Sequence, residues 1–305
     1  MTEVQPPAQE NSAKSHASRL FRMAKLILIA LLITPLLLGC SLYFFQRKMM
    51  YFPEPYRQEI PTNLNRWSIR QISYTTKDGA QVALLATHPG KDALDASTDV
   101  VPQPERLWVA FNGNASLALD WAWLMLADWE PNKPSAFLLV DYPGYGLCEG
   151  KPTRPGIIRN GKESLLAACQ EMNWNAETLP LGALGFSMGS AAAMEFAAAH
   201  PGADRIILLA PFTSILDMAK RTVPFPFHHV AVDRFNNKER LQEVLTRPEI
   251  RVTIFHGEAD QVIPVEMGRR LAELNPRIEL LTKPGVGHEA LMPFMGEILE
   301  RVETP

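Results

Sequence analysis

The chain has 305 residues and a formal net charge of −3, and 47% of its residues are hydrophobic. This near-neutral balance lacks the basic footprint of nucleic-acid-binding domains, so no nucleic-acid partner is expected. The three cysteines are too few for a disulfide framework. The sequence shows no glycine-rich phosphate loop, no spaced set of metal ligands and no internal repeat, so neither a metal nor another cofactor is predicted.

The N-terminal part divides into a polar leader and an apolar segment. Residues 1–22 begin with a polar stretch that contains proline and serine, which predicts a disordered leader. Residues 23–49 contain the uncharged run Leu26–Phe45, which is long enough to cross the ~30 Å hydrocarbon core of a bilayer. We therefore expect a single-pass membrane anchor.

Charges on either side of the apolar run predict its orientation. The upstream cluster of basic residues is the longer one and favours an N-terminus in the cytoplasm, with the following domain on the far side of the membrane. The upstream residues are Arg19, Arg22 and Lys25. An alternative remains, because Leu37–Cys40 resembles a bacterial lipobox, in which a lipid is attached to the cysteine and the preceding segment is removed. Both interpretations tether the rest of the chain to a membrane.

Residues 50–305 suit a single α/β domain. Trp67–Tyr74 and Gln81–Thr87 predict an opening hairpin, with Lys77-Asp78-Gly79 in its turn. Apolar strands then alternate with helices, which implies a mostly parallel sheet covered on both faces. The predicted strands are 107–111, 136–141, 181–186, 205–210, 251–256 and 278–281. The predicted helices are 117–129, 155–172, 190–200, 265–275 and 289–301.

The most informative motif lies between one of these strands and the helix after it. Gly185-Phe186-Ser187-Met188-Gly189 reads G-x-S-x-G. A strand, a sharp turn and a helix form the setting of a nucleophile elbow, which exposes the serine hydroxyl at the turn. The two glycines let the strand and the helix approach each other closely. Ser187 is therefore the predicted nucleophile.

Two further strands are each followed by a residue that suits the same chemistry. Asp260 follows the strand that ends at His256, and His288 lies in the loop after the last strand. A serine hydroxyl needs a base to take its proton, and a neutral imidazole suits that task. A carboxylate fixes the imidazole tautomer and stabilises the imidazolium. We predict Asp260 for this role over the nearby Glu258, and we predict a structural role for His256.

A developing oxyanion also needs backbone donors. One predicted donor is the N–H of Met188, directly after the nucleophile. The other is the N–H of Asn114 in the loop after the strand 107–111, with Ala115 as the alternative. Residues 211–249 are too long for a simple crossover and hold Pro224-Phe225-Pro226-Phe227, so we expect a small apolar lid there that could accept an acyl chain.

On these motifs the chain resembles the α/β-hydrolase superfamily from about Met50 to its C-terminus. More narrowly, it resembles membrane-tethered serine hydrolases that include bacterial esterase-like proteins and acyl-protein depalmitoylases. That branch usually has H-G-N-A and D-Y-R-G-Y-G-x-S-x-G motifs. Here Asn112 replaces the histidine, and Pro143 and Cys148 depart from the second motif. The family triad falls on Ser187, Asp260 and His288, where the residues themselves predicted it.

The sequence therefore predicts a membrane-tethered serine hydrolase that cleaves carboxylic esters or thioesters of a small or lipid-like acyl substrate. A serine peptidase with the same triad is one alternative, because the triad chemistry does not distinguish an ester from an amide. A catalytically silent, hydrolase-like binding protein is another, which an intact triad disfavours. Dehalogenases of this fold are disfavoured because their nucleophile is an aspartate.

Overall fold

The computed structural model describes residues 8–91, 103–127 and 129–303, and the chain forms two compact units, residues 1–46 and 47–305. Most of helix α1 (Ala8–Met50) lies in the first unit. The leader was predicted to be disordered over residues 1–22, but residues 8–22 are helical, and residues 1–7 lie outside the described residues. The reason is that good helix formers here extend a helix already nucleated by the apolar run, which removes the cost of starting one.

The apolar run makes α1 the part of the chain suited to a membrane. Within the described residues, Ser18–Met50 is the one helix long and apolar enough to cross a bilayer, and none of its most apolar window is buried by the protein. Length and composition of this kind occur in transmembrane anchors and also in N-terminal signal sequences.

The second unit is built on one sheet. Its described strands have the order β1-β2-β3-β5-β4-β6-β7-β8-β9. The strands are β1 (Asn63–Leu64), β2 (Trp67–Thr76), β3 (Gly79–His88), β4 (Leu107–Phe111), β5 (Ser135–Val140), β6 (Leu181–Phe186), β7 (Ala203–Leu209), β8 (Arg251–Gly257) and β9 (Ile278–Lys283). The first four strands in this order pair antiparallel. From β5 to β9 all pairs are parallel, so these strands end at one edge, which we call the carboxyl edge.

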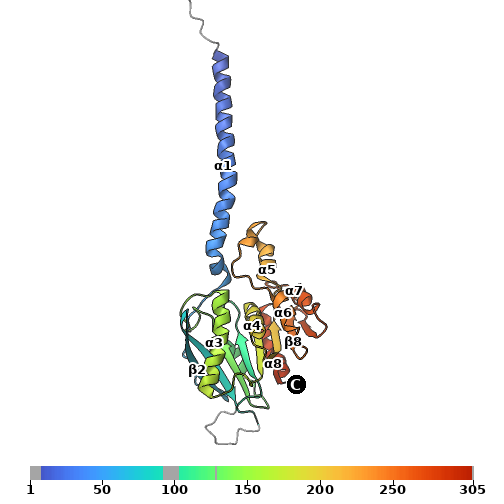
Figure 1. The fold of residues 1–305 in the computed structure, drawn as a ribbon. Coiled ribbons are helices and arrows are strands. Elements are labelled where there is room, and N and C mark those ends of the chain that lie inside the picture. Colours follow the sequence, from blue (N-terminus) through green and yellow to red (C-terminus); the bar gives the residue numbers. More distant parts are fainter. Residues whose placement is uncertain (1–7, 92–102, 128, 304–305) are drawn as a thin grey trace, which may run out of the picture. The chain divides into compact units, whose positions relative to one another are not determined.

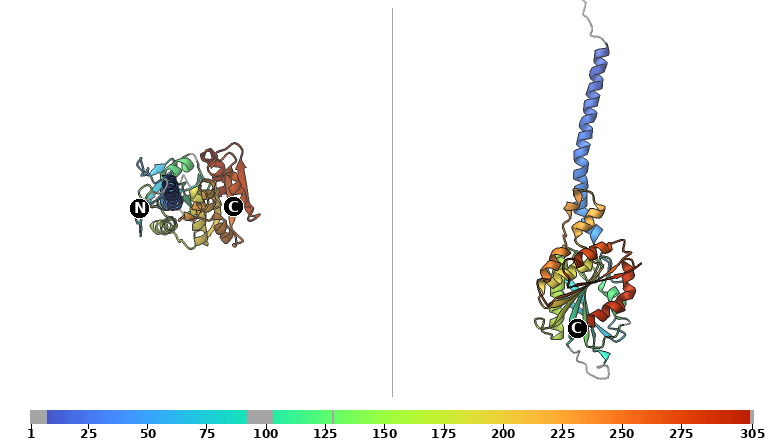
Figure 2. Two further views of the ribbon diagram at one scale, coloured as in Figure 1. Left: turned by 90° about the horizontal axis from the view of Figure 1, so that it is seen from above. Right: turned by 90° about the vertical axis from the view of Figure 1, so that its right-hand side faces the viewer.

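Helices cover both faces of the sheet, as the strand–helix alternation predicted (Figure 1; Figure 2). One face packs against α3, α4, α6 and α7, and the other against α2, η3 and α8. The bounds are α2 (Ala118–Leu126), α3 (Arg154–Met172), α4 (Met188–Ala199), α5 (Ile215–Thr222), η2 (Phe227–Val230), α6 (Asn237–Val244), α7 (Val265–Ala272), η3 (Glu289–Phe294) and α8 (Met295–Glu303). The predicted α/β class and mostly parallel sheet are confirmed.

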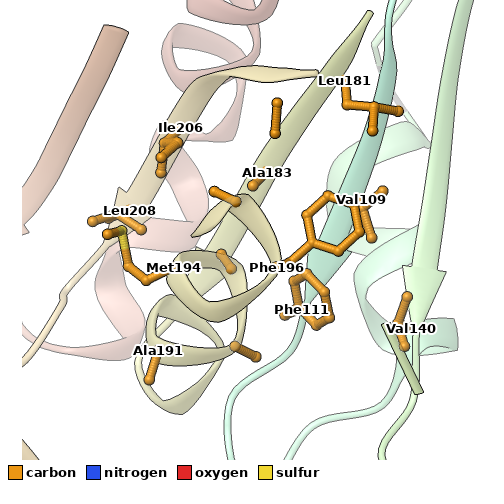
Figure 3. Packing of buried hydrophobic residues seen from close by; sticks show 14 of the residues in the cluster. Val109, Phe111, Val140, Leu181, Ala183, Ala191, Met194, Phe196, Ile206 and Leu208 are labelled. Atoms are coloured by element: carbon orange, nitrogen blue, oxygen red, sulfur yellow. The ribbon is translucent and has the colours of Figure 1, made fainter. Parts of the chain in front are cut away.

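The packing of α4 shows why the alanine-rich stretch after Ser187 forms a buried helix. Small side chains let α4 lie close to the sheet, and Met194 and Phe196 fill the remaining space against β4, β6 and β7 (Figure 3). The rings of Phe111 and Phe196 lie 5.8 Å apart between their centroids. The helix begins at Met188, two residues before the predicted Ser190, directly after the elbow serine.

The last predicted helix, 289–301, was wrong as a single element. The structure divides it into the 3₁₀ helix η3 and the α-helix α8, with Pro293 inside η3. Proline has no N–H to donate and its ring crowds the preceding turn, so a continuous α-helix through this position is costly.

The stretch predicted as a lid, residues 211–249, divides into an exposed part and a part that packs against the core. An antiparallel bridge between Ser214 and Asn236 closes off residues 214–236, which we call the excursion. Its helix α5 has no buried residue. The following helix α6 instead buries Leu241 and Val244 in the same cluster as α4, because its apolar residues recur every three to four positions. Residues 237–249 therefore belong to the body of the domain.

Candidate active site

The backbone turns sharply at Ser187, between β6 and α4. Its φ is +53° and its ψ is −116°, a conformation that L-residues rarely adopt. The surroundings hold it in place, since the Ser187 N–H donates to the carbonyl of Leu209 at 2.8 Å and its own carbonyl accepts from the Ser190 hydroxyl at 2.6 Å. A strained serine between a strand and a helix is the backbone geometry of a nucleophile elbow.

The two motif glycines are required by close backbone contacts. A Cβ on Gly185 would stand 2.1 Å from the carbonyl oxygen of Gly189. A Cβ on Gly189 would stand 2.0 Å from the carbonyl oxygen of Phe111, at the end of β4. Any side chain at either position would displace the backbone, so the G-x-S-x-G spacing follows directly from how tightly β6, α4 and β4 meet.

Asp260 and His288 are brought together from two loops at the carboxyl edge. The Nδ1 atom of His288 lies 2.7 Å from Oδ2 of Asp260. The other carboxylate oxygen accepts the backbone N–H groups of Val262 at 2.9 Å and Ile263 at 2.8 Å. A carboxylate facing Nδ1 favours the tautomer that carries its proton there, which leaves Nε2 free to accept one.

The imidazole of His288 also lies next to the elbow. Its ring centroid is 4.8 Å from that of Phe186, the residue immediately before Ser187. The ring of Trp121 on α2 contacts Phe186 from a centroid distance of 5.9 Å. Contacts at the end of β6 thus hold His288 beside the turn that carries Ser187.

The environment of Asp260 keeps it ionised. Burial alone would raise its pKa, but hydrogen bonds from His256, His288 and the N–H of Ile263 hold the pKa of Asp260 well below its usual range. His256 is fully buried and its Nε2 lies 2.8 Å from the carbonyl oxygen of Ile263 and 3.5 Å from Oδ2 of Asp260. His256 therefore supports the acid, a contact that its predicted structural role did not include.

Glu258 points elsewhere. Its carboxylate accepts the hydroxyl of Thr282 at 2.8 Å and lies 3.7 Å from the guanidinium of Arg269. Thr282 lies on β9, the last strand of the sheet, and Arg269 lies on α7. The geometry thus favours Asp260 over Glu258 as its carboxylate partner.

The loop after β4, where Asn114 was predicted to donate, is fixed against the elbow. Gly113 lies so close to the ring of Phe186 that a Cβ there would stand 3.2 Å from it. The carbonyl of Asn114 accepts from the N–H of Phe52 at 3.1 Å and from the hydroxyl of Tyr145 at 2.7 Å. As the first residue of α4, Met188 has an N–H without an acceptor inside the helix. Both predicted donors thus belong to backbone segments that meet at Ser187.

A buried acid, Asp141, supports this loop from the end of β5. One of its oxygens accepts from the N–H of Ala118 at 2.8 Å and the side-chain amide of Asn112 at 3.2 Å, and the other from the Tyr56 hydroxyl. Burial raises the pKa of Asp141 to about 6, although hydrogen bonds from Tyr56 and Ala118 oppose the rise. Asn112, the departure from the family motif, is thus a donor to Asp141. Nothing in the sequence spacing signalled this cluster.

The other two departures from the family motif also have identifiable surroundings. The thiol of Cys148 donates to the carbonyl of Val82 at 3.3 Å and accepts the N–H of the same residue at 3.4 Å, which ties the loop after β5 to β3. Pro143 packs near Gly156 at the start of α3. Both positions serve the loop and lie outside the contacts of Ser187 and His288 described above.

A cavity of about 300 Å³ borders the loop after β4. The cavity is lined by the segment that leads into the domain, by the loop after β4 and by α2. The lining residues include Glu54, Tyr56, Arg57, Ala115, Leu117 and Trp123. This volume is at the lower end of the range typical of small-molecule sites.

Comparisons with known proteins agree with this architecture. The chain resembles an esterase from Pyrococcus furiosus, with a TM-score of 0.56 and 15% identity over 83% of this chain and 95% of that one. The chain has the α/β-hydrolase fold. This confirms the fold that the sequence motifs predicted. No protein-family model matches the sequence.

Two curated relatives resemble parts of the chain. An uncharacterized protein of Mycobacterium tuberculosis, Rv2307c, is 29% identical over 156 residues, which cover 50% of this chain and 52% of that protein. Human alpha/beta hydrolase domain-containing protein 17B is 31% identical over 168 residues, or 53% of each chain. The match therefore spans about half the length of these relatives.

Proposed function

We propose that this protein is a membrane-tethered serine hydrolase that cleaves carboxylic esters or thioesters through an acyl-enzyme. The observation that carries the proposal is the 2.7 Å contact between His288 Nδ1 and Asp260, beside a serine held at a φ of +53°. An acid, a base and a strained serine gathered at one edge of the sheet suit nucleophilic acyl transfer.

In the acylation step, the Oγ of Ser187 attacks the substrate carbonyl carbon while Nε2 of His288 takes the hydroxyl proton. Asp260 stabilises the imidazolium that forms. The N–H groups of Met188 and Asn114 stabilise the oxyanion of the tetrahedral intermediate. The imidazolium then gives its proton to the departing alkoxide or thiolate, which leaves as an alcohol or a thiol, and the acyl group stays on Ser187.

In the deacylation step, a water molecule attacks the acyl-enzyme. Nε2 of His288 takes one proton from the water as its oxygen bonds to the acyl carbon, and then returns that proton to the Oγ of Ser187 as the serine leaves. The carboxylic acid is released and the free serine is restored. The same backbone donors serve both steps, because the oxyanion forms at the same place.

Fluorophosphonate labelling tests the nucleophile. A fluorophosphonate should label Ser187 of the detergent-solubilised chain, and Ser187→Ala should lose both the label and turnover of a water-soluble ester, by on the order of 10⁶ in kcat. Ser164→Ala is the matched control: it removes a buried hydroxyl bonded to Gly161 on α3, away from the elbow. Labelling that persists in Ser187→Ala would show that another residue is the nucleophile.

We propose further that α1 anchors the chain, with the hydrolase domain outside the cytoplasm. The support is the apolar stretch within Ser18–Met50 and the basic residues that precede it. Under this proposal the protein resists alkaline carbonate extraction and keeps its N-terminus. A mature chain that begins at a lipidated Cys40, seen by intact mass and blocked by Cys40→Ser, would instead establish the lipoprotein alternative.

A further inference from the structure

Exposed apolar side chains gather around the carboxyl edge of the sheet. They come from the segment after α1, the loop after β5, the excursion after β7 and the loop after β8. We call this set the apolar rim. Its members and their exposed fractions are Phe52 (46%), Leu147 (50%), Phe225 (79%), Val232 (44%) and Val262 (56%).

Two members of the apolar rim are hydrogen-bonded to residues of the candidate active site. The N–H of Val262 donates to the carboxylate of Asp260, and the N–H of Phe52 donates to the carbonyl of Asn114. Large exposed apolar side chains are unremarkable when scattered singly, but several around one edge indicate an interaction surface. Any partner of this surface would therefore lie at the entrance to the site.

The excursion is bound to the residues that directly follow the apolar run of α1. The carboxylate of Asp233 is buried and accepts from Nε of Arg47 at 2.9 Å and from the hydroxyl of Tyr51 at 3.3 Å. It also accepts the N–H of Arg154, at the start of α3, at 3.2 Å. Asp233 thereby fixes its neighbour Val232, a member of the rim, beside the point where the domain begins.

The covalent connection between the apolar run and Arg47 limits how far the apolar rim can lie from a membrane. Arg47 follows the apolar run Leu26–Phe45 after one residue, and a helix rises only 1.5 Å per residue. A bilayer that takes up this run must hold Arg47 at its surface, together with the excursion that Asp233 binds to Arg47. The membrane interface is thus the partner closest to the apolar rim.

Charge on the excursion suits the same partner. Lys220 and Arg221 form the last turn of α5, a helix with no buried residue. Basic side chains next to exposed aromatic and aliphatic ones favour a surface where lipid phosphates and acyl chains lie together.

We propose that the apolar rim docks on the bilayer surface, so that the site takes amphiphilic acyl esters or thioesters directly from the membrane. The acyl chain would pass from the lipid past Phe225 and Val262 to Ser187, without crossing water. This inference rests on the proposed function, and it narrows the substrate class to esters whose acyl chain is held in a bilayer.

Lipid quenching of a site-specific fluorophore tests the docking without requiring activity. The full chain is reconstituted in vesicles of phosphatidylcholine and phosphatidylglycerol, with a bimane label on Phe225→Cys in a Cys40→Ser background. The native thiols interfere little, because burial raises the pKa of Cys148 to about 12 and of Cys169 to about 11. The control is Leu166→Cys, at an exposed apolar residue (45%, against 79% for Phe225) that lies late in α3, away from the carboxyl edge.

Replacing phosphatidylcholine by its doxyl-labelled form should quench the label at position 225 and leave the label at 166 bright. Equal quenching at both positions, or none at 225, would overturn the docking. A label on the native Cys40 tests the anchor in the same vesicles. If Cys40 is quenched and position 225 is not, the anchor stands and the proposed rim does not.

Turnover tests the consequence for the substrate. Phe225→Asp should lower kcat/KM for a bilayer-embedded long-chain ester roughly tenfold or more, the effect of losing one buried aromatic side chain, and should lower it much less for a short water-soluble ester, which does not enter from the bilayer. Leu166→Asp should change neither. An equal loss on both esters would overturn the proposal. Failure of the unmodified chain to cleave either ester would contradict the proposed hydrolase activity, whereas the quenching result would still decide the docking.

Discussion

The elbow and the excursion lie at the same edge of the sheet and differ in how closely their sequences are constrained. At the elbow, the backbone of Gly189 packs so tightly against β4 that no side chain can be added. In the excursion, α5 buries no residue and Phe225 is 79% exposed. The elbow is held by close backbone contacts, whereas much of the excursion is exposed.

This difference in exposure and packing fits the two tasks proposed for the elbow and for the excursion. Nucleophilic catalysis needs reacting groups held to within a fraction of an ångström, and such placement comes from backbone contacts that tolerate little change. Recognition of a varied or fluid partner needs exposed apolar surface, which contributes little to the stability of the domain. Substitutions in the two regions should therefore differ both in size and in what they affect.

After the loss of the proposed nucleophile, the largest effect is expected from Asp260, the proposed acid of the site. Asp260→Asn removes the carboxylate that faces Nδ1 of His288 and favours the wrong imidazole tautomer, which should lower kcat by roughly 10⁴. Glu258→Gln should change kcat little, since Glu258 contacts Thr282 and Arg269 instead. Steady-state kinetics on a water-soluble ester measures both. The opposite ranking of the two variants would transfer the role to Glu258.

Adding one methyl group at the elbow should rank next. The Cβ of Gly189→Ala would stand 2.0 Å from the carbonyl oxygen of Phe111, so we expect a loss of about 3 kcal/mol or more in the free energy of unfolding. Gly296→Ala is the matched control in α8, where a Cβ meets nothing within 4 Å. Since Gly296 is in the first turn of α8, this substitution should change the free energy of unfolding by no more than about 1 kcal/mol. Urea unfolding compares them, and similar midpoints would contradict the tight packing at the elbow.

The sequence was most informative where structure is local. The elbow combines a strand, a turn residue and a helix former within a short stretch, and the strands and helices around it were predicted to within a few residues. The periodic pattern of apolar residues favours one helix over 289–301, whereas Pro293 indicates the break between η3 and α8. Ser187, Asp260 and His288 could be proposed from the sequence because each follows a strand of the parallel sheet, where such sites lie.

Contacts between distant segments could not be predicted in the same way. The carboxylate of Asp233 and the guanidinium of Arg47 are separated by 186 positions, and Asp141 meets Tyr56 across 85. No periodicity or spacing relates such pairs, because they depend on how complete elements pack. The support of Asp260 by His256 was missed for a different reason: the two residues are close in sequence, but only the fold turns one toward the other.

The buried acid behind the elbow should make stability depend on pH. The folded state favours the protonated form of Asp141, whose pKa rises from 3.8 to about 6. Its contribution is therefore full below about pH 4 and is lost as the pH rises through 6. Asp141→Asn should remove this decline, which amounts to at most roughly 3 kcal/mol. Asp260 has a lowered pKa and the opposite sign, so its contribution is lost only as the pH falls below about 4. Urea-unfolding midpoints measured between pH 4 and 7 test this pH dependence. If the midpoints of Asp141→Asn and of the unmodified chain changed with pH in parallel, the raised pKa of Asp141 would be contradicted.

The smallest effect on stability is expected in the excursion. Phe225→Ala removes an aromatic side chain that is 79% exposed, so the free energy of unfolding should change by less than about 0.5 kcal/mol. A buried phenylalanine would cost roughly 3–5 kcal/mol in the same substitution. The test is urea unfolding of the detergent-solubilised chain, and a loss near the larger figure would show that the excursion belongs to the core. A negligible change would instead leave Phe225 without a role in folding, and a large aromatic side chain exposed to this extent is then best explained by a partner outside the domain. Here the two regions differ most: the elbow is stabilised by the protein itself, whereas the exposed surface of the excursion is available to a membrane.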